Sequence, residues 1–235
     1  MAATSRKRIL GLIPAKGGSV RLARKNVRML GDKSLLGWAA AAARASGLIE
    51  RLIVSTEDAG VAEHARGLGI EVPFIRPLEL ARDPAGVVDV ALHALAELES
   101  QGNVYDTLFI LLPTCPFRSA EDMLGAHAMF LSAGAKFLMS VSEFSHTPYA
   151  AMSLGTDGLL TGLFPDKLGK KSQELPKAYR CNGAMHILDI PAFRAAKSYY
   201  ATPLVGFPMP RDRSIDIDTE ADLREAEALL HGRAG

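Results

Sequence analysis

Residues 9–26 read ILGLIPAKGGSVRLARKN, which joins a short apolar run to a cationic loop with adjacent glycines. The run 9–13 is followed by Pro14, a pattern typical of a buried strand. Glycines allow the backbone to approach a ligand closely, and successive backbone N–H groups can form an anion-binding nest. The loop is therefore interpreted either as a phosphate cradle or as a solvated turn after the first strand, and its composition favours neither.

Outward from this stretch, short apolar runs alternate with segments of helical length. Strands are predicted at 9–13, 52–55, 70–75, 107–112 and 136–141, and helices at 34–46, 58–68, 87–100 and 122–132. This alternation predicts an α/β fold, a mostly parallel sheet with helices on both faces. Ligands of such sheets bind at the carboxyl ends of the strands, so the loops that follow strands are the expected site.

The alternating pattern weakens between about 145 and 178, where Gly, Pro and Lys are frequent and no long helical repeat occurs. We interpret this segment as an irregular arm of a single domain that spans 1–235. An arm of this size is expected to cover either the active site or another subunit.

The charge and cysteine content limit the classes of function. The formal net charge is +1, so no global basic field predicts nucleic-acid binding, and any anion site must be local. The two cysteines, Cys115 and Cys181, form no C-x-x-C pair, which argues against a zinc site and fits a reducing compartment. With no apolar run near the ~20 residues that span a bilayer, a cytoplasmic protein without a membrane partner is expected.

A second candidate site is the stretch 214–220, SIDIDTE. If it is extended, Asp216 and Asp218 face the same way, and two such carboxylates suit Mg²⁺, which also takes phosphate oxygens from substrates. The alternative is that one aspartate only caps the following helix, since Thr219 and Asp222 have nearly the spacing of a capping box. A cationic glycine-rich loop together with paired carboxylates is what nucleoside-triphosphate chemistry needs.

A third candidate is the stretch 175–184, LPKAYRCNGA. Arg180 carries a forked donor that could hold a carboxylate or a phosphate, and the Asn182 amide can both donate and accept hydrogen bonds. The alternative interpretation is an arginine on an exposed strand edge.

Six stretches occur in order from about Arg8 to Leu230: IPAKGGSVRLARKN, IVSTED, RPLELARD, LPTCPFRS, YRCNGA and SIDIDTEADL. Together they resemble the acylneuraminate cytidylyltransferases, which are the CMP-sialic acid synthetases and their legionaminate and pseudaminate relatives. The resemblance implies a Rossmann-like nucleotide-diphospho-sugar transferase fold, Mg²⁺ as cofactor, and a homodimer in which the arm crosses to the partner. It also implies transfer of CMP from CTP to the 2-hydroxyl of a nine-carbon 2-keto sugar acid, with release of pyrophosphate.

The same resemblance implies roles for three sets of residues. The set expected to bind the nucleotide is Ala15, Gly17, Gly18, Ser19, Asn26, Arg76 and Ala85. The set expected at the reacting phosphates is Lys16, Arg21, Lys25, Asp216 and Asp218, and the two aspartates are also the expected metal ligands. The set expected to hold the sugar acid is Arg180, Asn182 and Gln173.

Several positions depart from the family pattern, among them Lys16, Val20, Val87 and Leu112. Lys16 replaces the usual arginine, which keeps the charge but loses the bidentate fork. Leu112 replaces a glutamine, which bears on the choice of sugar acid. Two alternatives stay open, a cytidylyltransferase for an eight-carbon Kdo-type acid and a non-catalytic nucleotide- or sugar-binding relative.

Overall fold

The structure is a computed structural model that describes residues 7–233, and its centre is a six-stranded sheet in the order β10-β6-β9-β5-β1-β4. The strands are β1 (Ile9–Pro14), β4 (Arg51–Ser55), β5 (Thr107–Ile110), β6 (Phe137–Glu143), β9 (Tyr179–Asp189) and β10 (Leu204–Pro208). Every neighbouring pair in this sheet is parallel except the two that β9 makes with β5 and β6. The predicted α/β fold with a mostly parallel sheet is confirmed.

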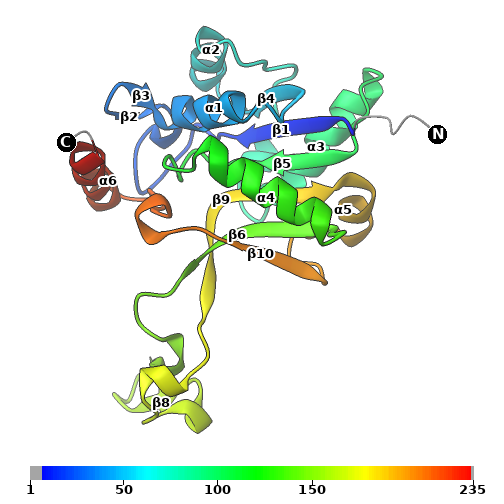
Figure 1. Ribbon diagram of the computed structural model, residues 1–235. Helices are drawn as coiled ribbons and strands as arrows, with labels where there is room; N and C mark the ends of the chain where they lie inside the picture. The colour runs from blue at the N-terminus through cyan, green and yellow to red at the C-terminus, as the bar shows by residue number, and fades with distance from the viewer. Residues whose placement is uncertain (1–6, 234–235) are drawn as a thin grey trace.

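Helices cover both faces of the sheet (Figure 1). They are α1 (Leu35–Ser46), α2 (Ala59–Gly67), α3 (Val87–Ser100), α4 (Ala120–Ser132), α5 (Ile190–Ala196) and α6 (Glu220–Arg233). One apolar cluster joins the sheet to α1, α2 and α4, and a second joins its other face to α3 and α5. Helix α6 packs apart from both, on a third cluster with Leu22, Leu30 and Ile217. Within residues 7–233, no helix is long and apolar enough to cross a membrane.

Helix ends follow the local signals in the sequence. Ser34 caps α1 by accepting a hydrogen bond from the Gly37 N–H, and Gly47 ends this helix with φ +63°, where glycine is favoured. Helix α4 begins two residues earlier than the expected start at 122, because Ser119 and Asp122 form a capping box ahead of Ala120.

The prediction of a strand at 70–75 is wrong. Its only ladder contact within the described chain is an isolated bridge between Ile53 and Glu71. Pro73 has no N–H to offer a strand ladder. The segment instead turns toward the end of β4, where the Arg76 N–H donates to the Thr56 carbonyl at 2.9 Å.

Strand β9 is a feature that the sequence interpretation missed. Its Asn182-Gly183 pair looks like a turn, but Gly183 adopts φ +72° inside the strand, and the pairing with β6 shifts register between Met139 and Val141. The chain therefore bends without leaving the sheet. This irregularity lies beside Arg180, at the end of the strand nearest the arm.

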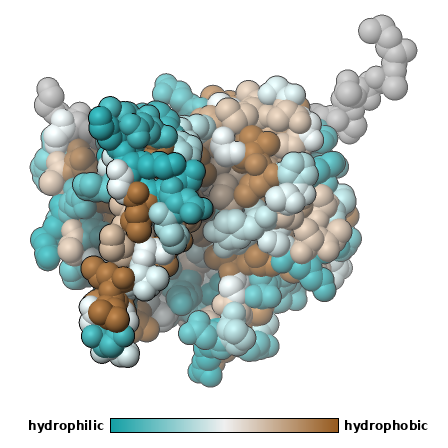
Figure 2. All heavy atoms as spheres, turned by 90° about the horizontal axis from the view of Figure 1, so that it is seen from below, coloured by the Kyte–Doolittle hydropathy of each residue, from teal (hydrophilic) through white to brown (hydrophobic). Residues whose placement is uncertain are grey.

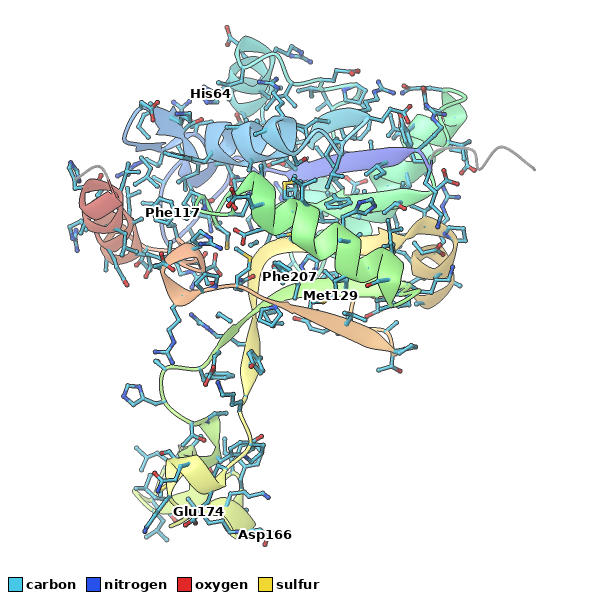
Figure 3. The ribbon with its side chains drawn as sticks, in the orientation of Figure 1. His64, Phe117, Met129, Asp166, Glu174 and Phe207 are labelled. Carbon is cyan, nitrogen blue, oxygen red and sulfur yellow. The ribbon has the colours of Figure 1, made fainter. Side chains whose placement is uncertain are left out.

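The arm comprises residues 144–178, between the end of β6 and the start of β9, and projects from the body (Figure 1). It holds the hairpin β7 (Met152–Leu154) and β8 (Leu160–Gly162) and the short 3-10 helices η3 (Pro148–Ala150), η4 (Pro165–Lys167) and η5 (Ser172–Glu174). Figure 3 shows Asp166 and Glu174 at its far end. Figure 2 shows the molecule from below, with the arm nearest the viewer, and apolar side chains lie among polar ones on this part of the surface.

His186 lies in the middle of β9, is 3% exposed and stacks on Tyr199 with ring centroids 4.4 Å apart. Within the described residues, its Nδ1 has no hydrogen-bond partner. Burial lowers the pKa of His186 to about 4. The imidazole is therefore neutral in the folded protein at neutral pH.

This burial predicts a pH dependence of stability. Because the unfolded state takes up a proton near its ordinary pKa of 6.5 and the folded state only near about 4, the free energy of unfolding falls as the pH drops between these values. The loss is about 3 kcal/mol. Urea unfolding of the wild type and of His186→Leu at pH 7 and pH 4.5 measures it, and the variant should lose less stability between the two. Parallel pH profiles would contradict the prediction.

Candidate active site

The glycine-rich loop leaves the carboxyl end of β1 and folds onto the segment that follows β4. The Gly17 N–H donates to Glu57 Oε1 at 2.8 Å, and Asn26 Nδ2 donates to the Lys16 carbonyl at 2.8 Å, closing the loop on itself. A Cβ on Gly17 would lie 2.4 Å from Asp58 Oδ2, so a side chain there would force either the loop or Asp58 to shift. These contacts hold the loop in a defined conformation, so it is not only a solvated turn.

A cavity of about 280 Å³ lies between this loop, the 3-10 helix η2 (Leu78–Ala81) and the first turn of α3; we call it the first cavity. Six of the predicted residues line it: Lys16, Ser19, Lys25, Asn26, Arg76 and Ala85. The other three predicted nucleotide residues lie outside its lining. Ala15 is buried and donates its N–H to the Ser55 carbonyl, Gly17 faces Asp58, and Gly18 is exposed.

The first cavity contains polar atoms without protein partners. Arg76 is 3% exposed and forms an ion pair with Glu57, yet its Nε has no hydrogen-bond partner among the described residues, and neither does Ser19 Oγ. Burial disfavours the charged form of Glu57, but hydrogen bonds from Arg76 and the Gly17 N–H outweigh it and lower the pKa of this carboxyl. Buried polar atoms are normally paired, so these two donors indicate a place for a polar ligand.

A second cavity, of about 780 Å³, lies between the segment before α6 and the residues that join the arm to the body, 142–145 and Arg180. Its lining includes Arg21, Arg180, Asp216 and Asp218, four of the predicted residues. Arg180 comes from β9, opposite Ser142 of β6. It therefore stands in the wall of a cavity, and not on an isolated strand edge.

Ion pairs of Asp218 link the linings of the two cavities. Its Oδ1 pairs with Lys25 Nζ at 2.6 Å, and its Oδ2 pairs with Arg21 Nη2 at 2.6 Å. Lys25 lines the first cavity, whereas Arg21 and Asp218 line the second. A group bound by Lys25 and a group held in the second cavity would therefore lie side by side.

The segment that carries the two aspartates is not a strand. It runs as irregular chain, fixed by the buried Ile217, whose N–H donates to the Thr114 carbonyl at 2.8 Å. Asp216 and Asp218 still line the same cavity. Partial burial and the neighbouring Asp218 charge raise the pKa of Asp216, although a hydrogen bond from Thr114 opposes this.

Thr219 and Asp222 form the capping box of α6 that their spacing predicted. The Asp222 N–H donates to Thr219 Oγ1 at 3.3 Å, and Asp222 Oδ2 accepts hydrogen bonds from the Asp218 N–H at 3.0 Å, the Thr219 N–H at 2.7 Å and Thr219 Oγ1 at 2.8 Å. The alternative that Asp216 or Asp218 only caps this helix is therefore not needed, because other side chains make the capping contacts. Neither carboxylate is used to cap the helix, and both line the second cavity.

The donor set in the second cavity fits a hard cation that keeps water or substrate oxygens. Among residues 7–233, no three His, Cys, Asp or Glu side chains are gathered to hold a metal by themselves. Two carboxylates together with phosphate oxygens and water are the ligands that Mg²⁺ takes in many proteins, whereas zinc sites use three or four protein ligands.

Two of the three residues predicted to hold the sugar acid also lie outside both cavities. Asn182 is 3% exposed, and its side chain bonds only to protein groups. Gln173 lies in η5 on the arm and lines neither cavity.

Arg118 holds part of the site in place through hydrogen bonds, and the sequence interpretation did not single it out. It is 3% exposed, donates from Nη1 to the Ala184 carbonyl and from Nη2 to the Leu112 carbonyl at 2.7 Å, and burial lowers its pKa to about 10. It thereby ties the loop after β5 to β9, and Leu112 and Thr114 of this loop line the first cavity. The signal was an arginine directly before the capping serine of a helix.

Comparison with known proteins agrees with this architecture. The family model described as "Cytidylyltransferase" matches residues 10–123. The chain is 34% identical over 226 residues to a CMP-N,N'-diacetyllegionaminic acid synthase of Legionella pneumophila, covering 95% of this chain and 96% of that protein. It is 31% identical over 221 residues to a pseudaminic acid cytidylyltransferase of Campylobacter jejuni, covering 94% and 95%.

A solved structure shares the fold at low identity. A CMP:2-keto-3-deoxy-manno-octonic acid synthetase complexed with CTP superposes with a TM-score of 0.72 at 14% identity, over 96% of this chain and 99% of that one. With the two relatives above, which match along nearly their whole length, this chain belongs to the cytidylyltransferase family, in the acylneuraminate-type group with the legionaminate and pseudaminate enzymes, and is a nucleotidyltransferase.

Proposed function

We propose that the protein transfers CMP from CTP to the 2-hydroxyl of a sialic-acid-like, nine-carbon 2-keto sugar acid and releases pyrophosphate. The observation that carries this proposal is the contact of Lys25, from the first cavity, with Asp218, in the wall of the second. A nucleotide and a sugar acid in these cavities would meet at the aspartate pair. The printed names of the legionaminic and pseudaminic acid relatives support this class of acceptor.

Under this proposal, the first cavity holds the nucleoside. Leu80, Val87 and Val90 supply apolar walls, and the unpaired Arg76 Nε and Ser19 Oγ supply donors. The phosphates then extend along Lys16 and Lys25 toward the second cavity. Such fixed cations stabilise charge that develops on a leaving group more in the transition state than in the ground state.

Mg²⁺ bound by Asp216 and Asp218 would neutralise the α-phosphate and favour the ionised acceptor hydroxyl. Arg21 and Lys25 pair with Asp218 in the structure, and they would move to the triphosphate when it binds. Arg180 would hold the carboxylate of the sugar acid through its planar fork, which turns the 2-hydroxyl toward the phosphate. The resulting displacement breaks the α–β phosphoanhydride bond as the new ester bond forms.

The proposal is tested by measuring pyrophosphate release from CTP with a panel of acceptors, each with and without Mg²⁺. The panel is Neu5Ac, Kdn, legionaminic acid, pseudaminic acid and Kdo. Release with at least one nine-carbon acid is expected. Release with Kdo alone would favour the eight-carbon alternative, and CTP binding without any release would favour the non-catalytic one.

We also propose that the arm pairs two copies of the chain. The hairpin places Leu154 opposite Leu160, and these side chains are 71% and 63% exposed. Apolar side chains so exposed on a projecting hairpin favour contact with another surface.

The Leu154→Lys/Leu160→Lys variant should therefore sediment as a monomer at concentrations where the wild type is a dimer. Two desolvated lysines would oppose the contact. Sedimentation equilibrium measures the mass, with Leu131→Lys, an exposed leucine on α4, as the control. A wild type that stays monomeric at all concentrations would contradict the proposal.

A further inference from the structure

Asn182 has every polar atom of its side chain engaged inside the protein. Its Oδ1 accepts from Ser140 Oγ at 2.6 Å and from the Ala184 N–H at 3.1 Å. Its Nδ2 donates to Ser214 Oγ at 2.9 Å and lies 3.5 Å from Met209 Sδ. A primary amide has two acceptor sites and two donors, so nothing remains for a substrate.

These bonds form one directed chain across three parts of the fold. The Ser140 hydroxyl on β6 donates to Asn182 on β9, Asn182 donates to Ser214, and the Ser214 hydroxyl donates to the Pro210 carbonyl at 2.7 Å. Ser140 and Ser214 are buried as completely as Asn182. The chain thus connects the sheet to the segment that immediately precedes Asp216.

A second contact holds the neighbouring loop to the same residue. Cys115 Sγ donates to the Asn182 carbonyl at 2.6 Å, and it lies 3.9 Å from Asp216 Oδ1. On the other side of Ser214, Arg213 pairs with Asp122 at the start of α4. Ser214 is therefore the point where the aspartate segment is attached to β9, and Arg213 attaches it to α4.

We propose that Asn182 and Ser214 are positioning residues for the Asp216–Asp218 pair, and that Asn182 does not contact the sugar acid. This inference rests on the proposed metal site of the preceding section. The aspartate segment has no strand ladder of its own, so these side-chain bonds hold it together with the Ile217 N–H bond to the Thr114 carbonyl. Residues that orient metal ligands from behind typically change metal affinity about 10- to 100-fold when they are replaced.

The experiment measures Mn²⁺ affinity by electron paramagnetic resonance in the presence of a non-hydrolysable CTP analogue. Ser214→Ala and Asn182→Ala should each weaken Mn²⁺ binding about 10-fold, and the double variant should lose little more than either single one, because the residues act together. Turnover should recover with excess Mn²⁺, while the KM for the sugar acid stays unchanged. Ser46→Ala is the matched control, since it removes a buried hydroxyl bonded to Ala43 far from the site.

Two results would overturn the inference and leave the proposed metal site standing. One is wild-type Mn²⁺ affinity in both variants, and the other is a raised KM for the sugar acid at saturating metal, as a substrate contact would give. If the wild type itself bound no Mn²⁺ with the nucleotide, the proposed metal site would fail, and this inference with it. Ser214→Ala keeps the test open if Asn182→Ala does not fold, because it removes a single oxygen.

Discussion

Replacing Asp216 with asparagine is expected to lower kcat for pyrophosphate release by about 10³-fold. The substitution keeps the size of the side chain but removes one of the two charges offered to the metal. The loss of metal-dependent stabilisation of a reacting phosphate is several kcal/mol, and each ~1.4 kcal/mol is tenfold in rate. Among residues 7–233, Asp216 makes no ion pair, unlike Asp218, so its replacement leaves the contacts of Lys25 and Arg21 in place.

The measurement is a titration of turnover with Mg²⁺ at saturating CTP. Asp32→Asn, which removes an exposed carboxylate paired with Lys33 in the turn between β2 (Met29–Leu30) and β3 (Lys33–Ser34), is the control. The unfolding temperature of both variants should remain close to that of the wild type. Undiminished turnover of Asp216→Asn at ordinary Mg²⁺ concentrations would show that the metal is held elsewhere.

Replacing Lys25 with alanine is expected to lower kcat by about 10²- to 10³-fold, the cost of removing one preorganised donor from a developing charge. Lys25 reaches Asp218 across the boundary of the two cavities, and no other cation among the predicted residues lines the first cavity and also contacts Asp218 in the structure. The loss should therefore fall mainly on kcat, since Lys16 and Arg76 still line the nucleotide cavity.

Steady-state kinetics with varied CTP separates kcat from KM. Arg24→Asn is the control, because it removes a positive charge from the same loop at an exposed position with φ +52°, where asparagine is tolerated. A Lys25→Ala variant that changed only the KM for CTP would assign Lys25 to ground-state binding.

The layout of the fold could be read from local patterns because each pattern has a local physical cause. The short apolar run 9–13 next to Pro14 indicated a buried strand, and the glycine at position 47 ended α1 where a left-handed residue was needed. Strand β9 could not be read in this way. Its Asn-Gly pair has the local chemistry of a turn, and only the pairing with β5 and β6 on both sides keeps it in the sheet.

The candidate site likewise contains residues that the sequence could identify and one that only the structure could explain. Lys16, Ser19, Lys25 and Arg76 could be chosen from composition and resemblance, and the structure brings them into one cavity. Asn182 could not be judged from its type, because an amide serves a substrate or a buried network equally well. Its burial between two serines, far apart in the chain, assigns it to the network.

The amino-acid sequence by itself determined the α/β class, the family and the types of side chain expected at the site. Strand and helix periods and helix caps depend on residues that are near one another in the sequence, and charged side chains can be recognised directly. The tertiary structure alone decided that Lys25, which lines the first cavity, contacts Asp218, which lines the second. Lys25 and Asp218 lie 193 positions apart in the chain. Contacts over such separations arise from the packing of the whole sheet, so no local pattern can specify them.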